Sequence, residues 1–295
     1  MIKSGARLAG LLIAVVLALS LAACGDGASE QQAIRVGAIA TGAAQAEQQR
    51  YKETARQLQD ALGTKVDLVT STDYYAIAEA LRGNRIDVAF LGSLSYVLIE
   101  PRVQVEPVAV GVDDSGTPGY FSYLVTNKPA EIRQPSDVRG HKLALASKLS
   151  TSGYLFPLDV LRKTGVDPEK DTTLSQGGNH AANILAVASG QVDAAFVDSV
   201  EYESAVRSGK ADPSKVVKVW QSDRITGSPV VVRAALPAQR REAITRALLS
   251  LRGSEQAPIG VEKSTRLVPA TASDYDPIRA LARQAGLSVE DLRRK

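Results

Sequence analysis

Short apolar runs alternate with amphipathic stretches along the first part of the chain. Residues 33–40, 65–71 and 86–92 are rich in Val, Ile, Leu and Ala, as buried strands are. Between them, residues 46–62 and 73–84 repeat apolar side chains at helical spacing. Strands separated by helices are typical of a doubly wound, mostly parallel sheet. The pattern therefore predicts an α/β fold.

The same alternation returns further along the chain. Residues 141–147, 172–177 and 192–198 have the pattern of strands, and residues 152–163 and 179–189 have the pattern of helices. A second α/β unit is therefore predicted.

A repeated sequence segment occurs once in each of the two units. "RIDVAFLGSLSY" (residues 85–96) aligns without a gap on "QVDAAFVDSVEY" (residues 191–202), with Asp, Ala, Phe, Ser and Tyr in register. Each copy follows a predicted helix that ends near a glycine, Gly83 or Gly190. The same strand-turn-helix unit is thus used twice, which predicts two similar α/β lobes.

Two further β-rich runs, residues 120–127 and 229–233, decide where the chain passes between the lobes. If both belong to the first lobe, the crossovers fall near residues 128–137 and 221–228. A ligand would then lie in the cleft between the lobes, at the carboxyl ends of the strands. We predict these boundaries: lobe 1, residues 33–130 plus 226–295; lobe 2, residues 131–225.

The N-terminus has the layout of a secretory signal peptide. Lys3 and Arg7 precede a charge-free apolar run, residues 8–24, that ends in small residues. A transmembrane anchor is the alternative, but the run is short for a span of roughly 17 to 25 residues. We predict that residues 1–23 are a signal peptide.

Cys24 ends the sequence "LAAC", which resembles the lipobox of bacterial lipoproteins. It is the only cysteine of the chain, so it has no internal disulfide partner. Lipidation gives this thiol a role, and more than one acyl chain would anchor the protein stably. We therefore predict an extracytoplasmic, membrane-anchored lipoprotein with a polar tether at residues 24–32.

The charge of the chain excludes one class of partner. The formal net charge is +3, but removing Lys3 and Arg7 with the signal peptide leaves 33 basic and 32 acidic side chains. There is no basic block and no aromatic platform, so the composition does not indicate a nucleic-acid-binding protein. We expect a monomer without a cofactor or metal.

The stretch "LSTSGYLFP" places Ser150, Thr151 and Ser152 on a turn between a predicted strand and a predicted helix. Free N–H groups at a helix start, with the positive end of the helix dipole, attract anions. Gly153 leaves room for a ligand to approach the backbone, and Pro157 suits the first helical turn. An ordinary helix cap is the alternative, and the stretch lacks the GxxxxGK of a phosphate-binding loop.

A second helix start strengthens the anion hypothesis. In "SQGGNHAANILAV", a glycine-rich turn leads into His180, so further N–H groups and an imidazole would face the same point. Tyr74 and Tyr120, at or beside the ends of first-lobe strands, would form the opposite wall. A lone histidine is as often a satisfied structural residue, and an aromatic residue beside a turn is usually packing.

Four segments together resemble a known family. "STDYYAIAEALRGNRIDVAFLGSLSY", "GTPGYFSYLV", "STSGYLFP" and "GGNHAANILAVASGQVDAAFVDS" are similar to segments of the phosphate, phosphite and phosphonate substrate-binding proteins of bacterial ABC transporters. The likeness runs over residues 34–251, and the ordered set is more specific than any one segment. It implies the type II periplasmic-binding fold, an α/β fold with two lobes, two crossovers and one ligand cleft, and a permease as partner.

The resemblance also implies roles for individual residues. Ser150, Thr151, Ser152 and His180 would hold a small phosphorus oxyanion, with Tyr74 and Tyr120 closing over it. Further ligand-binding candidates are Ser93, Asp198 and Ser228.

One departure from the family bears on the ligand. Members that take aminoalkylphosphonates hold the ammonium group with two carboxylates, and the matching positions here are Val200 and Ser228. Asp198 or Glu201 would substitute if the alignment shifts by a residue or two. The simpler interpretation is a ligand without an amine: phosphite, a small alkylphosphonate or phosphate.

The same residues are compatible with two other functions. A serine hydrolase would use Ser150 or Ser152 as nucleophile, His180 as base and Asp198 to orient it, although no GxSxG elbow is present. A lipoprotein that senses the ligand without feeding a transporter would have the same binding site.

Overall fold

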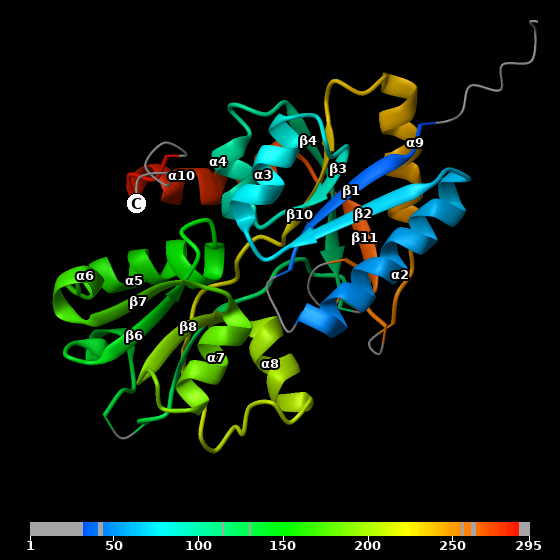
Figure 1. Ribbon diagram of the computed structural model, residues 1–295. Helices are drawn as coiled ribbons and strands as arrows, with labels where there is room; N and C mark the ends of the chain where they lie inside the picture. The colour runs from blue at the N-terminus through cyan, green and yellow to red at the C-terminus, as the bar shows by residue number, and fades with distance from the viewer. Residues whose placement is uncertain are drawn as a thin grey trace, which may run out of the picture. The chain divides into compact units, whose positions relative to one another are not determined.

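The computed structural model describes residues 32–40, 44–113, 115–129, 131–254, 257–260 and 264–288 (Figure 1). The predicted signal peptide, Cys24 and all but the last residue of the predicted tether lie outside these ranges. The secondary structure belongs to the unit Ile34–Lys295. None of the helices within the described ranges is long and apolar enough to cross a membrane.

The first sheet has six strands. β1 pairs in parallel with β2 and β3, while β10 runs antiparallel between β3 and β4. Helices α2 (Ala44–Leu62), α3 (Tyr74–Arg82), α4 (Ser93–Ile99) and α9 (Ala238–Ser250) accompany this sheet, and we call the assembly lobe 1. The strand order is β11 (Arg266–Pro269), β4 (Val105–Val112), β10 (Pro229–Arg233), β3 (Val88–Phe90), β1 (Ile34–Ile39) and β2 (Val66–Ser71).

The second sheet has five strands and forms lobe 2. β6 is parallel to β7 and β8, whereas β5 is antiparallel to β8 and β9. The strand order is β7 (Thr173–Gly178), β6 (Lys142–Ala146), β8 (Ala194–Asp198), β5 (Ser122–Thr126) and β9 (Val217–Gln221). The helical elements are η1 (Pro135–Val138), η2 (Thr151–Leu155), α5 (Phe156–Lys163), α6 (Pro168–Asp171), α7 (His180–Ala188) and α8 (Ser199–Arg207).

The position of β5 corrects the predicted lobe boundary. Residues 33–130 were assigned to lobe 1, but β5 pairs along its whole length with β8 and β9 of lobe 2. The first crossover therefore lies between β4 and β5 rather than at residues 128–137. β5 is buried throughout, so its composition fits the interior of either sheet and does not indicate which one it joins.

The two crossovers lie side by side. Tyr120 N–H donates to Ile225 O at 3.2 Å, and Ile225 N–H donates to Tyr120 O at 2.8 Å. Gly119 has φ +116°, and a Cβ there would lie 2.3 Å from Ile225 O. A side chain at this position would therefore force the crossovers apart.

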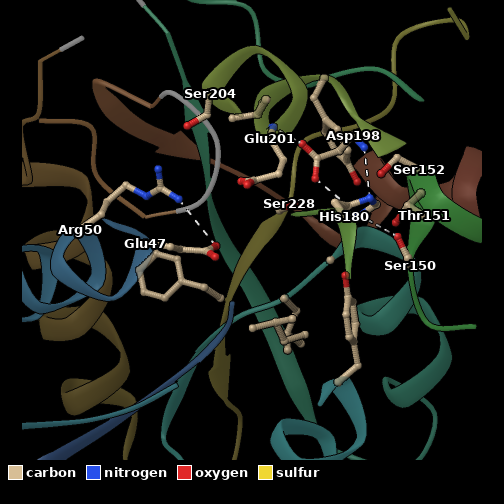
Figure 2. A pocket seen from close by; sticks show the side chains of 17 residues that line it. Glu47, Arg50, Ser150, Thr151, Ser152, His180, Asp198, Glu201, Ser204 and Ser228 are labelled. Carbon is tan, nitrogen blue, oxygen red and sulfur yellow. Dashed lines mark hydrogen bonds and ion pairs between the residues drawn. The ribbon is translucent and has the colours of Figure 1, made fainter. Parts of the chain in front are cut away.

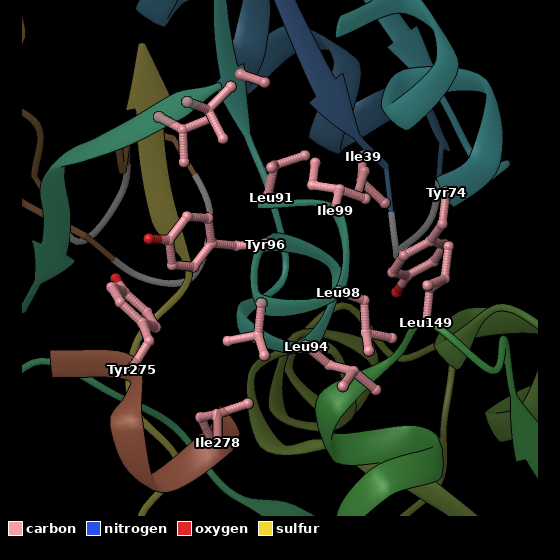
Figure 3. Close-up of a cluster of buried hydrophobic side chains, with 14 of the residues drawn as sticks. Ile39, Tyr74, Leu91, Leu94, Tyr96, Leu98, Ile99, Leu149, Tyr275 and Ile278 are labelled. Carbon is pink, nitrogen blue, oxygen red and sulfur yellow. The ribbon is translucent and has the colours of Figure 1, made fainter. Parts of the chain in front are cut away.

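The apolar core is continuous from lobe 1 to one edge of lobe 2. One cluster contains Leu94 and Leu98 of α4 together with Leu149 and Leu155 of lobe 2 (Figure 3). Two hydrogen bonds cross at the same place: Leu94 N–H donates to Thr151 Oγ1 at 2.9 Å, and the Ser95 hydroxyl donates to Leu149 O at 3.0 Å. The lobes are thus in contact beside the turn that the sequence singled out.

After β11 the chain stays in lobe 1 and forms η3 (Ala272–Tyr275) and α10 (Asp276–Gln284). The ring of Tyr275 packs edge-on against Tyr96 of α4, with centroids 5.1 Å apart. Arg279 pairs with Glu100 at 2.6 Å. These contacts fix α10 to α4.

Candidate functional site

A cavity of about 50 Å³ lies among the ends of β1, β3, β6 and β8 (Figure 2). That space suits a small oxyanion. The lining includes eight of the nine predicted ligand-binding residues: Tyr74, Tyr120, Ser150, Thr151, Ser152, His180, Asp198 and Ser228.

The triple-hydroxyl turn follows β6 and leads into η2. Ser150, Thr151 and Ser152 are each at most 2% exposed. Ser150 caps the turn, because its hydroxyl accepts from Gly153 N–H at 3.0 Å. Leu155 N–H donates to Ser150 O at 3.2 Å, five residues back, so the turn is π-helical rather than α-helical. Single π-turns are rare in helices and frequent at functional sites.

The hydrogen bonds of His180 define its tautomer. Asp198 N–H donates to His180 Nδ1 at 3.1 Å, so Nδ1 has no hydrogen and Nε2 carries it. Nε2 lies 3.2 Å from Ser150 Oγ and 3.5 Å from Asp198 Oδ2. Burial lowers the pKa of His180, although the nearby Asp198 carboxylate partly offsets this effect. The imidazole is therefore a neutral donor.

Ser150 becomes a donor as a consequence. Its oxygen accepts from Gly153 N–H and from His180 Nε2–H, which uses both lone pairs. Its own hydrogen is left to donate, either to the Tyr74 phenol or to a ligand oxygen. Burial raises the pKa of Tyr74, so the phenol keeps its hydrogen and can also donate.

Gly153 has a different role from the predicted one. It does not line the cavity, and a Cβ there would lie 2.4 Å from Ala146 Cβ and 2.8 Å from His180 Cε1. The absent side chain thus lets η2 pack closely against β6 and the imidazole. It does not make room for a ligand.

The second helix start contributes less than predicted. Gly178 and Asn179 are not among the lining residues, and Asn179 caps α7 by accepting from Ala182 N–H at 2.8 Å. A Cβ on Gly178 would lie 2.5 Å from Asn183 Oδ1. His180 is therefore the contribution of this turn to the lining.

Ser93 is the predicted ligand-binding residue that lies elsewhere. It is fully buried, and its hydroxyl donates to Thr226 O at 2.8 Å. That carbonyl belongs to the second crossover. In this structure the Ser93 hydroxyl supports the crossover, and a ligand contact by Ser93 stays a prediction.

Sequence reasoning missed Glu47, Arg50 and Ser204 as lining residues, and it considered Glu201 only as a partner for an ammonium group. Glu47 and Arg50 of α2 lie across the cavity from His180, and Glu201 and Ser204 of α8 complete this side (Figure 2). Glu47 is 4% exposed, with Arg50 Nη2 3.6 Å from its carboxylate. Charged residues in the first turns of an amphipathic helix usually face solvent, so the sequence offered no sign of this arrangement.

The lining has an excess of negative charge among the described residues. It holds three carboxylates, those of Glu47, Asp198 and Glu201, and one guanidinium, that of Arg50. Val200 and Ser228 also line the cavity. Neutral donors and carboxylates thus share one small space.

Comparison with known proteins gives a consistent result. The family model described as "ABC transporter, phosphonate, periplasmic substrate-binding protein" matches residues 36–275. The "Phosphate-import protein PhnD" of Mycolicibacterium smegmatis is 29% identical over 251 residues, which is 78% of each chain.

Solved structures have the same fold. A binding protein component of an ABC phosphonate transporter from Pseudomonas aeruginosa is 25% identical and superposes with a TM-score of 0.77 over 88% of this chain and 91% of its own. PhnD1 of Prochlorococcus marinus, in complex with methylphosphonate, is 21% identical with a TM-score of 0.75, over 86% and 98%. The predicted two-lobed periplasmic-binding fold is confirmed.

Proposed function

Because the chain belongs to the family of periplasmic substrate-binding proteins of phosphonate ABC transporters, we propose that it captures a small phosphorus oxyanion for import. Phosphite, a small alkylphosphonate and phosphate are the candidate ligands. Ser150, Thr151, Ser152 and His180 would hold the oxyanion, and Tyr74 and Tyr120 would close over it.

The single observation that carries this proposal is the set of neutral donors that line the cavity. The Ser150 hydroxyl has a hydrogen to give, because His180 Nε2–H and Gly153 N–H already donate to its oxygen. The Tyr74 phenol has one as well, since burial raises its pKa. Hydrogen bonds to a charged group contribute roughly 1.5 to 3 kcal/mol each. Several of them, less the costs of closure, suit a dissociation constant of micromolar to nanomolar order.

The charge of the lining limits which chemical groups the ligand can carry. An oxyanion beside Asp198 and Glu201 is repelled unless it offers hydrogen to their carboxylates. A monoanion with a P–OH group does so, and so does an ammonium group on the ligand. Val200 and Ser228 favour the P–OH monoanion, because neither side chain pairs with a cation. The carboxylates of Glu47 and Glu201 would instead pair with an ammonium group on the ligand.

A serine hydrolase fits the geometry poorly. A catalytic base needs a free lone pair on the imidazole nitrogen that faces the serine. Here Nε2 faces Ser150 and carries the hydrogen, because Nδ1 accepts from Asp198 N–H. His180 would therefore donate to Ser150 and not remove its proton.

The remaining parts of the proposal concern the setting of the protein. Lipidation of Cys24 would keep the protein at the outer face of the cell membrane. We expect the protein to be a monomer. The closed form would dock on the permease of the transporter, since a ligand held by both lobes stabilises the closed form.

A thermal-shift panel tests the ligand class. The mature protein is heated with phosphate, phosphite, methylphosphonate, aminoethylphosphonate or sulfate, and a ligand at one hundred times its dissociation constant stabilises it by about 2.7 kcal/mol. We expect the largest shift with phosphite, methylphosphonate or phosphate, and little with sulfate, which has no proton to offer the carboxylates. A shift with sulfate alone, or with none of the five, refutes the proposal.

A further inference from the structure

Ser122, the first residue of β5, joins the end of the first crossover to the triple-hydroxyl turn. Its side chain is fully buried, and its hydroxyl donates to Ser152 O at 2.6 Å. Its backbone is held as well, since Ser122 N–H donates to Ser222 Oγ at 2.9 Å and Ser222 N–H donates to Ser122 O at 2.9 Å. Ser222 begins the second crossover, so both crossovers meet at this point.

The neighbouring residue is tied to the other side of the cavity. Phe121 N–H donates to Ser199 Oγ at 3.1 Å, and Ser199 N–H donates to Phe121 O at 2.9 Å. Ser199 directly follows Asp198, which lines the cavity. Two adjacent residues at the lobe 2 end of the first crossover thus support two of the three turns that carry lining residues of lobe 2, those at Ser150 and at Asp198.

The Ser122 hydroxyl acts on an unusual piece of backbone. In η2 the helical bonds span five residues, from Leu155 N–H to Ser150 O and from Phe156 N–H to Thr151 O. Ser152 O also receives a bond from outside the helix. A buried carbonyl that loses its partner is costly. Without Ser122, the turn is expected to tighten toward ordinary α-helical spacing, which would move the hydroxyls of Ser150 and Ser152.

We propose that Ser122 is a positioning residue for oxyanion binding, which holds η2 in its π-helical form through the Ser152 carbonyl. The proposal rests on the function proposed above. Ser122 does not line the cavity, so it acts through the turn. Ser122 also lies at the end of the first crossover. The arrangement of the hydroxyls and the connection between the lobes therefore both depend on this residue.

The chain offers a matched control on the same strand. Thr126 at the other end of β5 is also fully buried, and its hydroxyl donates to Asp193 O at 2.7 Å. Ser122→Ala and Thr126→Val each delete one hydroxyl-to-carbonyl bond without leaving a large void, and Thr126→Val also removes the acceptor of Lys128 N–H. Only the first variant removes a bond to η2.

The experiment measures affinity and backbone protection in wild type, Ser122→Ala, Thr126→Val and Ser122→Thr. Calorimetry with the panel member that gives the largest shift should show at least tenfold weaker binding for Ser122→Ala, a change within twofold for Thr126→Val, and recovery in Ser122→Thr, which keeps the hydroxyl. Hydrogen exchange should be faster at the amides of Leu155 and Phe156 in Ser122→Ala, but not in Thr126→Val.

The outcomes separate the two proposals. Equal affinity and equal exchange in the Ser122→Ala and Thr126→Val variants overturn the positioning role, even when the wild type binds the oxyanion well. If the wild type binds no panel member, the proposed function fails. The exchange of Leu155 and Phe156, which needs no ligand, then decides whether Ser122 holds the turn: unchanged exchange in Ser122→Ala overturns that role.

Discussion

Replacing Thr151 by valine tests whether one hydroxyl serves both the ligand and the contact between the lobes. Valine keeps the shape of the side chain, so the variant removes only the hydroxyl group. The lost bond to a charged ligand is worth roughly 1.5 to 3 kcal/mol, which corresponds to a factor of about 10 to 150 in affinity. In addition, Leu94 N–H, which donates to Thr151 Oγ1 at 2.9 Å, loses its acceptor in the closed form.

Ser95→Ala is the matched control for this variant. The Ser95 hydroxyl also bridges the lobes, to Leu149 O at 3.0 Å, but Ser95 does not line the cavity. Loss of a neutral hydrogen bond costs roughly 0.5 to 1.5 kcal/mol, so we expect at most about tenfold weaker binding. Calorimetry on both variants, with circular dichroism as a check on folding, distinguishes the two effects. Equal losses for Thr151→Val and Ser95→Ala would mean that Thr151 acts only in closure, and unchanged affinity of Thr151→Val would refute its contact with the ligand.

Two further predictions follow from the charges of the site. Burial lowers the pKa of His180 in the folded protein. As the pH falls below about 6.5, this imidazole is therefore protonated in the unfolded chain before it is protonated in the folded one. The free energy of unfolding should then drop by up to about 1.4 kcal/mol per pH unit. Urea titrations at pH 7.5, 6.5 and 5.5 should show this drop in the wild type and a smaller one in His180→Gln. If the free energy of unfolding fell equally with pH in both proteins, the result would contradict a buried neutral imidazole. Glu201→Gln removes one lining carboxylate to which the P–OH group of the ligand would donate, so affinity for an amine-free phosphorus oxyanion should fall severalfold. Stronger binding in calorimetry would instead mean that Glu201 only repels the oxyanion.

The sequence predicted those parts of the fold that depend on local pattern. The strands and helices of both lobes follow from apolar periodicity, and the turn at Ser150 follows from a hydroxyl cluster between a strand and a helix. Eight of the nine predicted ligand-binding residues gather in one cavity because the carboxyl ends of parallel strands from both sheets, and both crossovers, meet there.

The errors concern long-range pairing and packing. β5 is apolar enough for either sheet, so only its antiparallel pairing with β8 and β9 assigns it to lobe 2. Gly153 sits where a ligand approach would require a glycine, yet Ala146 and His180 occupy the space. Glu47 and Arg50 enter the lining because α2 begins over the cavity, which no pattern within α2 indicates.

The two roles of Thr151 bear on how binding and closure depend on each other. Its oxygen accepts from Leu94 N–H of lobe 1, and its own hydrogen remains to donate to a ligand. A hydroxyl that donates to an anion becomes a better acceptor, because hydrogen bonds in a chain polarise one another. A bound oxyanion would therefore strengthen the bond that holds the lobes together, and the closed lobes would in turn orient the hydroxyl toward the oxyanion. By reciprocity, any change that weakens this contact between the lobes must also weaken ligand binding.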